Sequence, residues 1–470
     1  MSSPPTFDTI IIGAGMSGLA AGIRLAQFDQ RVLILEKHYL WGGLNSFFKR
    51  AGRRFDVGLH ALTNWVPKGT RGTPLSKLLR QLRLGYDDLK LGQQSFSEVR
   101  FPGVKLAFSN DFELLRSEIA RAFPDQVEGF ESLVRRIDAY DAFRPSDTSL
   151  SARSQLSQSI SDPQLVDMLL CPLLFYGSAR EDDVDWYQGV ILFKSILQEG
   201  FARPAGGIKP LLDLLVARYR DLGGELRMRS GVKEIVHEDG RCLGVRLEDG
   251  QELAAQKVLS SAGWAESMRL AGDDMYARHV RPEELGTLSF VESIHVLDRE
   301  PADLGFGATI QFFNDAPEFR YRRPAGLVDT QSGVLCCPNN YASEEPLREG
   351  IIRTTSLANP VAWRELVGDA YEAAKEEVQT SILARAQEHL GFHPRDYSVF
   401  SDCFTPRTVE RFTGRIDGAV YGASTKRFDG KTPLQNLHLI GTDQGLLGVT
   451  GAMLSGVSMA NRYCLKPSLR

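Results

Sequence analysis

The chain has 470 residues, of which 43% are hydrophobic and 24% charged, with a formal net charge of −4 at pH 7. This length favours two domains, and the charge provides no basic surface for nucleic acid. No apolar run approaches the roughly 20 residues of a membrane-spanning helix, and no signal-peptide pattern precedes the first motif, so we expect a cytoplasmic protein. Six cysteines and eight histidines show no metal-ligand spacing, so we expect no metal site and two reduced thiols at Cys336-Cys337.

The most informative segment is a glycine-rich turn near the start of the chain. Thr9–Ile12 is expected to be a buried strand, and Gly13-Ala14-Gly15-Met16-Ser17-Gly18 then opens a helix. The first glycine permits a tight turn, the second lets the backbone approach a pyrophosphate, and the third lets the helix pack closely on the strand. A second strand over Arg31–Leu35 leads to Glu36, whose carboxylate can accept hydrogen bonds from a ribose. This order predicts a dinucleotide site; the alternative is a glycine turn in an unrelated α/β protein.

The segments after Glu36 favour FAD over a nicotinamide cofactor. Gly42-Gly43-Leu44 and Arg54-Phe55-Asp56-Val57-Gly58 stand where a nicotinamide enzyme would continue with another strand–helix–strand unit. Their glycines would let the backbone lie against a second part of the cofactor. The acidic residue also suits an unphosphorylated ribose, because it would repel a 2′-phosphate.

The middle of the chain alternates between two patterns. Pro67 to Gly200 is expected to be rich in amphipathic helix, as the spacing of Leu75, Leu78, Leu79 and Leu82 indicates. A helix and a strand meander then return to the first domain, over Ile208–Leu222, Glu225–Met228, Val232–His237, Cys242–Glu248, Gln251–Leu253 and Lys257–Ser261. Strands over Thr287–His295, Ala308–Phe313 and Gly333–Cys337, with a long helix within Pro360–Leu390, are expected to form a sheet that roofs the cofactor.

The end of the chain carries a second crossover from strand to helix. A strand over Leu437–Gly441 leads through Asp443 into the glycine turn Gly445–Gly451 and a helix of small residues. Such a turn can point backbone N–H groups at a flavin ring, and Asp443 can accept hydrogen bonds from ribityl hydroxyls. The alternative is a small-residue helix packed on a sheet.

Both ends of the chain resemble the FAD-binding segments of amine-oxidase-like flavoproteins, in the branch of phytoene desaturases, prolycopene isomerases and retinol saturases. The resemblance is strong over Asp8–His60, Glu410–Thr413, Gly418–Gly422 and Gly448–Gly451, where Thr450 replaces a frequent proline, and recognisable over Pro204–Gly263. It is weak over 67–200 and 268–391, which would build the substrate site.

The resemblance implies an α/β fold with a Rossmann-type FAD-binding domain assembled from the discontinuous segments 1–66, 201–267 and 402–470. An α+β substrate domain of mixed sheet and helices would comprise 67–200 and 268–401. In such proteins a backbone group at Val232 contacts the adenine, and the Ala262-Gly263 turn lies near the pyrophosphate. The residues expected to bind FAD are Gly13, Gly15, Met16, Ser17, Gly18, Glu36, Lys37, Gly42, Gly43, Leu44, Asp56, Gly58, Leu59, His60, Val232, Ala262, Gly263, Gly441, Asp443, Gly448, Val449 and Thr450.

The chemistry expected at this site needs few titratable groups, since the flavin itself transfers hydride at N5 and a polyene offers no ionic handle. His60 is the candidate catalytic residue, and a neutral imidazole bonded to backbone is the alternative. Asp56 is expected to cap backbone N–H groups rather than act as a base. The aromatic residues considered for a substrate tunnel are Phe175, Tyr176, Trp186, Tyr187, Phe193, Phe312 and Phe313, with Trp41 beside the cofactor.

We therefore expect an FAD-dependent oxidoreductase that desaturates a long apolar isoprenoid or carotenoid polyene. Isomerisation or saturation through reduced flavin, a flavin amine oxidase, and a non-catalytic flavin-binding protein at a membrane surface are the alternatives. Because a polyene must be collected from lipid, we expect peripheral membrane contact through the helices of 67–200, including Leu78 and Leu79. The polyene and the electron acceptor stay open at this point.

Overall fold

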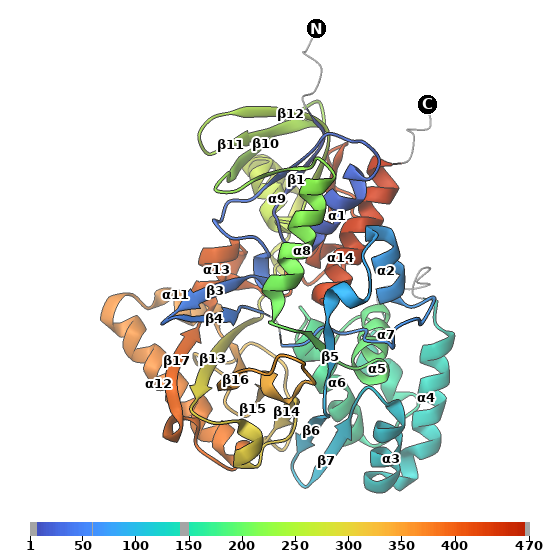
Figure 1. The fold of residues 1–470 in the computed structure, drawn as a ribbon, viewed down its shortest axis with the longest axis vertical. Coiled ribbons are helices and arrows are strands. Elements are labelled where there is room, and N and C mark those ends of the chain that lie inside the picture. Colours follow the sequence, from blue (N-terminus) through green and yellow to red (C-terminus); the bar gives the residue numbers. More distant parts are fainter. Residues whose placement is uncertain (1–6, 59, 142–149, 466–470) are drawn as a thin grey trace.

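The computed structural model describes residues 7–58, 60–141 and 150–465. These residues form two large sheets, one above the other in Figure 1, with helices around them. The upper sheet has the order β10-β11-β12-β1-β2-β9, and β18 also pairs with β12. Its strands are β1 (Phe7–Ile12), β2 (Val32–Leu35), β9 (Glu225–Arg227), β10 (Val232–Glu238), β11 (Arg241–Leu247), β12 (Glu252–Ser260) and β18 (Leu437–Leu439).

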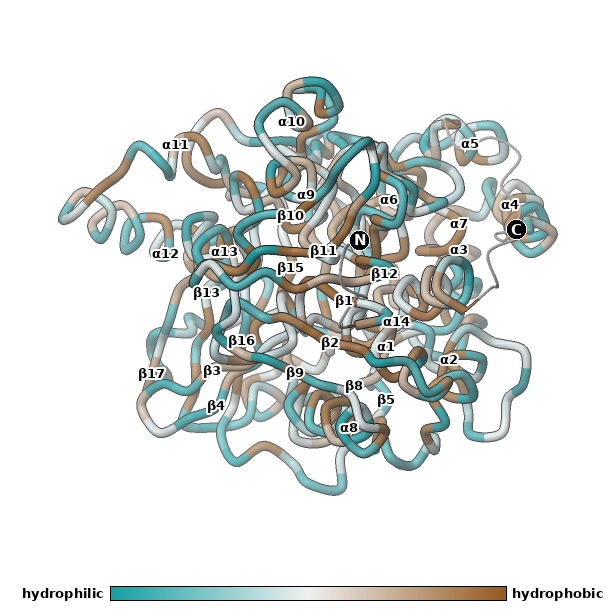
Figure 2. Tube along the Cα trace, turned by 90° about the horizontal axis from the view of Figure 1, so that it is seen from above, coloured by the Kyte–Doolittle hydropathy of each residue, from teal (hydrophilic) through white to brown (hydrophobic). Residues whose placement is uncertain are grey.

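The centre of the upper sheet is parallel and comes from three distant parts of the chain. β1 pairs with β2 on one side and with β12 on the other, where Ile10 lies opposite Val258. β9 and β18 extend the parallel order at the two sides. Helices cover this sheet, so β1 and β2 read as nearly continuous apolar runs, and Figure 2 shows their hydrophobic colour in the interior. The expected Rossmann-type sheet of discontinuous segments is confirmed.

Strand β12 differs from the expectation of two separate strands. Its first residues pair antiparallel with β11, as Gly244 does with Ala254, and from Ala255 onward it pairs parallel with β1. One continuous strand can pair in both ways because the antiparallel pairing with β11 ends at Ala254 and the parallel pairing with β1 begins at Ala255. The meander β10–β11 is thereby joined to the parallel sheet without a loop.

The helices on the upper sheet pack closely because small residues face their neighbours. A Cβ at Gly22 would lie 2.7 Å from Ile34 Cδ1, and a Cβ at Gly456 would lie 2.0 Å from the carbonyl oxygen of Ser17. The second contact brings the last long helix onto the first one. The helices of this part are α1 (Met16–Ala26), α2 (Pro74–Leu82), α8 (Ile208–Asp221), α9 (Trp264–Leu270), α10 (Asp273–His279) and α14 (Gly448–Met459).

Helix α2 corrects one expectation about membrane contact. Its residues Leu75, Leu78, Leu79 and Leu82 are all buried, in the same core cluster as apolar residues of α1 and α14. Leu78 is 0% exposed and Leu79 is 7% exposed, so neither side chain can reach lipid. The helical spacing was correct, but its apolar face packs on the upper sheet's helices.

The lower sheet has the order β17-β13-β16-β15-β14-β6-β7. The strands expected near 287–295, 308–313 and 333–337 correspond to β13, β14 and β15. Segment 67–200 was expected to be helix-rich, and it also supplies β6 and β7, which extend the sheet beside β14. The strands are β6 (Ser97–Phe101), β7 (Val104–Phe108), β13 (Ser289–Leu297), β14 (Ile310–Asn314), β15 (Ser332–Cys336), β16 (Gly350–Ala358) and β17 (Ser398–Phe404).

Two short antiparallel pairs lie outside the two large sheets. β3 (Phe47–Arg50) pairs with β4 (Arg53–Asp56), and β5 (Leu91–Gln93) pairs with β8 (Ala202–Pro204). Strand β17 crosses position 402, where the second part of the substrate domain was expected to end. The division into two domains stays a prediction at its boundaries.

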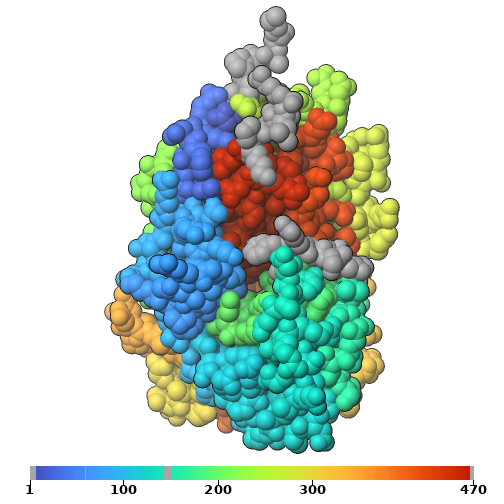
Figure 3. Space-filling view, turned by 90° about the vertical axis from the view of Figure 1, so that its right-hand side faces the viewer, coloured from blue at the N-terminus to red at the C-terminus, as the bar shows by residue number. Residues whose placement is uncertain are grey.

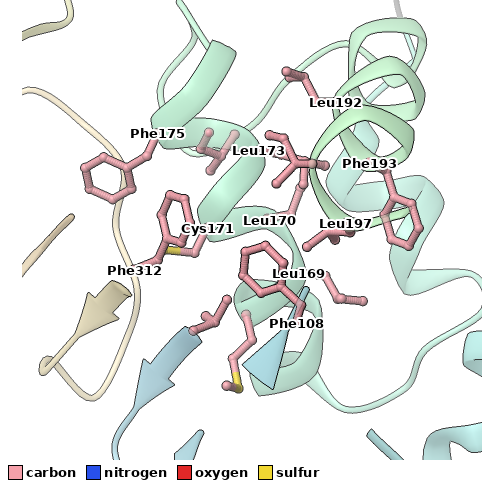
Figure 4. Packing of buried hydrophobic residues seen from close by; sticks show 14 of the residues in the cluster. Phe108, Leu169, Leu170, Cys171, Leu173, Phe175, Leu192, Phe193, Leu197 and Phe312 are labelled. Carbon is pink, nitrogen blue, oxygen red and sulfur yellow. The ribbon is translucent and has the colours of Figure 1, made fainter. Parts of the chain in front are cut away.

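The helices around the lower sheet form two groups in Figure 1, α3–α7 at one end and α11–α13 at the other. Figure 4 shows the apolar core of the first group, where Leu170 of α6, Phe193 of α7, Phe108 of β7 and Phe312 of β14 share one cluster. The helices are α3 (Phe112–Ala122), α4 (Val127–Ala139), α5 (Ala152–Ser157), α6 (Pro163–Gly177), α7 (Trp186–Phe193), α11 (Pro360–Glu365), α12 (Gly368–Leu390) and α13 (Pro406–Thr413). All six cysteines are free thiols, including Cys336 and Cys337.

Candidate functional site

A cavity of about 1330 Å³ is walled by both sheets and by helices between them. It is larger than the roughly 300–1,000 Å³ of common ligand pockets, so it has room for more than one small molecule. Its wall combines the turn after β1 and the start of α14 with β13, β15, β16, α6 and α7. The predicted residues that line it are Gly13, Gly15, Met16, Ser17, Glu36, Lys37, Gly42, Gly43, Leu44, Gly58, His60, Val232, Ala262, Gly441, Gly448 and Val449.

The first glycine turn has three different steric environments. Gly13 has φ +96°, and a Cβ there would lie 2.3 Å from Ser261 Oγ. A Cβ at Gly18 would lie 2.0 Å from the carbonyl oxygen of Gly13, so this residue serves helix packing and does not line the cavity. A Cβ at Gly15 would have only the Gly42 carbonyl oxygen nearby, at 3.9 Å. The space at Gly15 is therefore open to the cavity, as a close pyrophosphate requires.

Glu36 follows β2 and lies beside this turn. Its carboxylate accepts hydrogen bonds from the backbone N–H of Ala14 at 2.8 Å and of His38 at 2.9 Å. The side chain reaches the cavity wall, and an ionised carboxylate has about four acceptor positions. It can therefore hold the turn and still accept hydrogen bonds from a ribose.

A second turn presses backbone against the first. The N–H of Gly42 donates to the carbonyl oxygen of Ala14 at 2.9 Å, and Gly42 has φ +111°. A Cβ at Gly58 would lie 2.4 Å from the carbonyl oxygen of Leu44. These contacts exclude side chains and leave backbone at the wall, which suits contact with a dinucleotide.

Asp56 does not line the cavity. Its carboxylate accepts a hydrogen bond of 3.0 Å from the backbone N–H of Ile208, at the start of α8, and it forms an ion pair with Arg203. The expected capping of a backbone N–H group is what the structure shows, and the expected contact of Asp56 with the cofactor stays a prediction. Leu59, also expected at the cofactor, lies outside the described residues.

Asp443 is likewise turned away from the cavity. It is 1% exposed, and it accepts hydrogen bonds from the backbone N–H groups of Trp264 at 2.6 Å and Ala423 at 2.9 Å, and from Arg415 Nη1 at 3.0 Å. Burial raises the pKa of this carboxyl, but Arg415 and Lys426 outweigh it and the net pKa is lowered. The structure thus gives Asp443 protein partners behind the wall, and its expected hydrogen bonds from ribityl hydroxyls stay a prediction.

Gly263 and Thr450 lie behind the wall. A Cβ at Gly263 would lie 2.2 Å from Arg415 Nη1, and Thr450 is 0% exposed with its hydroxyl donating to the carbonyl oxygen of Thr63 at 3.4 Å. Neither lines the cavity, and their expected contact with the cofactor stays a prediction. Arg415, which sequence reasoning did not single out, does line the wall.

His60 lies in a cluster with Glu292 and Arg353, at the face of the lower sheet that lines the cavity. Its Nε2 lies 3.2 Å from Oε2 of Glu292, and Glu292 is also ion-paired with Arg353. Burial raises the pKa of Glu292, but Arg353 and His60 outweigh it and the net pKa is lowered. The imidazole thus faces an ionised carboxylate, whereas the sequence considered only a backbone partner.

Glu292 and Arg353 were missed from the sequence. Strand pairing places Glu292 of β13 opposite Thr355 of β16 and Phe404 of β17. Glu292, Thr355 and Phe404 all line the cavity, so this row crosses the face of the lower sheet that covers it. A charged residue in the middle of the apolar run 288–297 was the available signal.

The aromatic residues divide into wall and core. Phe175, Tyr176 and Tyr187 line the cavity, as the tunnel interpretation expects. Trp186, Phe193, Phe312 and Phe313 do not line it and are buried in the apolar clusters. Trp41 does not line it either; its ring lies under the Arg220 guanidinium, 6.0 Å from the ring centroid.

The comparisons with known proteins agree with this geometry. The sequence profile described as "Flavin containing amine oxidoreductase" matches residues 16–302, more than half of the chain. The chain belongs to this flavin-containing amine oxidoreductase family. The matched range begins at Met16, within the glycine turn, and includes the meander β10–β12.

Two relatives and one solved structure illustrate the relationship. The chain is 24% identical to "Prolycopene isomerase 2, chloroplastic" from an Oncidium hybrid cultivar, over 97% of this chain and 83% of the relative. It is 29% identical to "Phytoene desaturase (neurosporene-forming)" from Rhodobacter capsulatus, over 54% of this chain and 52% of the relative. An oxidoreductase from Methanosarcina mazei has the same fold, with a TM-score of 0.67 at 17% identity, covering 96% of this chain and 99% of that one.

Membership of a flavin-containing family fits the open space at Gly15 and the backbone-lined turns. Within residues 7–58, 60–141 and 150–465, no group of three or more histidine, cysteine, aspartate or glutamate side chains is arranged to hold a metal ion. No helix among these residues has the length and apolar character needed to cross a bilayer.

Proposed function

We propose that this protein is an FAD-dependent oxidoreductase that desaturates a long apolar isoprenoid or carotenoid polyene. The observation that carries the proposal is the continuity of one cavity from the dinucleotide turns to an apolar, aromatic wall formed by the lower sheet and α6. The names of the relatives, which include a phytoene desaturase, support the same class of substrate.

FAD would be held mainly by backbone. Gly13 and Gly15 would receive the pyrophosphate at the start of α1, where the helix N-terminus attracts negative charge. Glu36 would accept the ribose hydroxyls, and the backbone at Val232 would meet the adenine. Gly441, Gly448 and Val449 at the start of α14 would lie near the flavin ring.

The substrate would occupy the part of the cavity below the flavin. Phe290 and Val334 of the lower sheet and Phe175 of α6 line this part. They can exclude water from a reacting polyene and orient it by shape alone. Bound FAD supplies the acceptance of hydride at N5.

Desaturation also releases a proton from the carbon next to the one that loses hydride. His60 is our candidate to accept that proton at the cavity wall. The carboxylate of Glu292, held by Arg353, would stabilise the imidazolium that forms, because an opposite charge at this distance favours the charged form. An unidentified oxidant must then take the two electrons from the reduced flavin, and lipid-soluble quinones are the class of oxidant to test.

The test is turnover by the FAD-loaded protein with phytoene in liposomes, with a quinone as acceptor, followed by absorbance and chromatography. We expect products of longer conjugation under oxidising conditions and a tenfold or greater loss with His60→Gln. Oxidation of a water-soluble amine without polyene turnover would overturn the proposal in favour of an amine oxidase. Flavin that neither a substrate nor an outside donor reduces would favour the non-catalytic alternative.

Isomerisation is the second candidate, favoured by one observation. The prolycopene isomerase aligns with 97% of this chain, whereas the phytoene desaturase aligns with 54%. Incubating prolycopene with protein whose FAD has been reduced separates the two reactions. A cis-to-trans shift without a change in conjugation would identify isomerisation, and loss of a double bond would identify saturation.

Peripheral membrane contact remains part of the proposal, without α2 as its surface. Because a long polyene is nearly insoluble in water, activity should require liposomes or detergent. Flotation with liposomes beside a turnover assay tests this. Recovery of all the active protein from the aqueous fraction would contradict it.

A further inference from the structure

One stretch of the cavity wall combines three features that proteins concentrate at functional sites. Asn64 has φ +65°, a left-handed conformation that is strained for a residue other than glycine. Lys194–Gln198 forms a π-helical turn, which is a rare geometry. Glu199 follows that turn with a half-buried side chain. Asn64, Lys194 and Glu199 all line the cavity, and the proton transfer proposed for His60 uses none of them.

The segments that carry Asn64 and Glu199 lie side by side. The backbone N–H of Leu62 donates to the carbonyl oxygen of Ala202 at 2.7 Å, and that of Ala202 donates back at 2.9 Å. Beyond this pair, Nδ2 of Asn64 donates to Oε2 of Glu199 at 2.7 Å. The backbone N–H of Asn64 also donates to the carbonyl oxygen of Ser195 at 3.2 Å. These contacts hold the Glu199 carboxyl at a fixed point of the wall.

That point adjoins the start of α14. A Cβ at Gly448 would lie 3.7 Å from Oγ1 of Thr63, the neighbour of Asn64. The hydroxyl of Thr450 donates to the carbonyl oxygen of Thr63 at 3.4 Å. Gly448 is one of the residues proposed to lie near the flavin ring. Glu199 is therefore a carboxyl beside the place proposed for the ring, connected to it through Asn64 and Thr63.

The surroundings of Glu199 make its ionised form costly. Burial raises the pKa of this carboxyl, and the hydrogen bond from Asn64 and the charge of Lys194 offset only part of the effect. The end of α4 lies against the π-helical turn and brings two further carboxylates, Asp138 and Asp141. A new negative charge in the cavity would raise the cost of the ionised carboxyl again and favour the uptake of a proton.

We propose that Glu199 takes up a proton when the bound flavin is reduced and releases it when the flavin is reoxidised. For each two electrons and one proton that enter the flavin, one further proton enters the carboxylate, so the net charge of the site does not change. Desaturation supplies both protons, because hydride carries one with the two electrons and the neighbouring carbon releases the other. The inference rests on the proposed function and adds Glu199 to His60 as a second proton-carrying residue.

The test measures the midpoint potential of the FAD-loaded protein against pH, on the alkaline side of neutrality. A reduction that takes up two protons per two electrons lowers the potential with pH twice as steeply as one that takes up a single proton. We expect the steeper slope in the unaltered protein. Glu199→Gln keeps an acceptor oxygen for Asn64 and should halve the slope without loss of FAD.

Infrared difference spectra give a second readout that does not depend on activity. Reduction of the unaltered protein should add the C=O band of a protonated carboxyl, and Glu199→Gln should lack that band. Glu248→Gln is the matched control, because Glu248 is an exposed carboxylate on the same cavity wall, at the nucleotide end beside β10. This control and His60→Gln should both keep the steep slope and the band.

A one-proton slope and no new carboxyl band in the unaltered protein would overturn the inference. A steep slope that survives in Glu199→Gln, or is lost in His60→Gln, would assign the proton to another group. If Glu199→Gln did not fold, Glu199→Asp should keep the slope and shift the band, and an unshifted band would contradict the assignment. Polyene turnover with a one-proton slope would overturn this inference alone, whereas failure to bind FAD would overturn the proposed function as well.

Discussion

The carboxylate of Asp443 accepts a hydrogen bond of 2.6 Å from the backbone N–H of Trp264. This contact joins the turn after β18 to the first residue of α9, so it connects the segment that leaves β18 with the segment that leaves β12. The same carboxylate is the counter-ion for Arg415 and lies 3.9 Å from Lys426 Nζ. Asp443 therefore does not line the cavity, and it holds together the segments around Trp264, Arg415 and Ala423.

Asp443→Ala should destabilise the whole protein. Removing the carboxylate takes the nearer counter-ion from the buried cation Arg415, since Glu266 lies 3.8 Å away, and breaking a buried pair in this way costs about 3–5 kcal/mol. Urea denaturation of the FAD-loaded protein measures the loss. A variant of unchanged stability with a disturbed flavin spectrum would instead restore the direct ribityl contact.

Gly15→Ala and Gly18→Ala should separate cofactor binding from folding. A Cβ at Gly15 meets only one atom, at 3.9 Å, so the variant should fold normally and lose FAD. A Cβ at Gly18 would lie 2.0 Å from a backbone oxygen, so that variant should lose stability. Flavin content and thermal unfolding check the pair; full FAD occupancy in Gly15→Ala would show that the turn is misread.

Glu36→Ala should weaken FAD binding by about 1.5–3 kcal/mol for each lost charge-assisted hydrogen bond. The two backbone groups that the carboxylate accepts from would also lose their partner. Reconstitution with FAD and measurement of the dissociation constant give the result. Glu36→Gln is the control, because it keeps one acceptor oxygen and should retain more affinity.

Arg353→Met should be strongly destabilising, and Glu292→Gln should rescue it. Losing the cation leaves Glu292 as a buried charge with only His60 beside it, which costs about 3–5 kcal/mol. Since the pKa of Glu292 is lowered in the folded protein, its stabilising effect is present above its ordinary value of 4.5 and is lost as pH falls. Denaturation of the single and double variants at pH 7 tests the pair; additive losses would contradict the coupling.

The lowered pKa of Lys426 predicts that the free energy of unfolding rises at alkaline pH. Burial lowers its pKa from the ordinary 10.5 to about 8, partly offset by Asp443. Between these values the unfolded chain holds a proton that the folded chain has released, so stability should increase with pH by up to about 3 kcal/mol. The free energy of unfolding, measured by denaturation from pH 7 to 10.5, should rise with pH in the unaltered protein and in the control Lys431→Met. Loss of this rise in Lys426→Met would show that Lys426 causes it. An unchanged slope in Lys426→Met would contradict it.

Local features were predictable from the sequence, and long-range partners were not. The strand, glycine turn and helix of 7–26 follow from neighbours in the chain, and the structure confirms them. The Ile208 partner of Asp56 and the Glu292 partner of His60 depend on tertiary packing, so the sequence could not place these side chains on or off the wall. The apolar spacing of α2 likewise identified a helix but not the surface that it covers.

The contact between Gly456 and Ser17 also constrains how the protein is made. Figure 3 shows the red C-terminal segment on the surface beside the blue N-terminal one. While the ribosome is still synthesising the chain, α1 has no α14 to pack against, and β12 lacks its neighbour β18. In the nascent chain, one face of β1 and α1 therefore stays exposed until α14, which ends at Met459, has emerged from the ribosome. We therefore expect chaperones to bind the newly made N-terminal segment, and deletion of α14 to prevent folding.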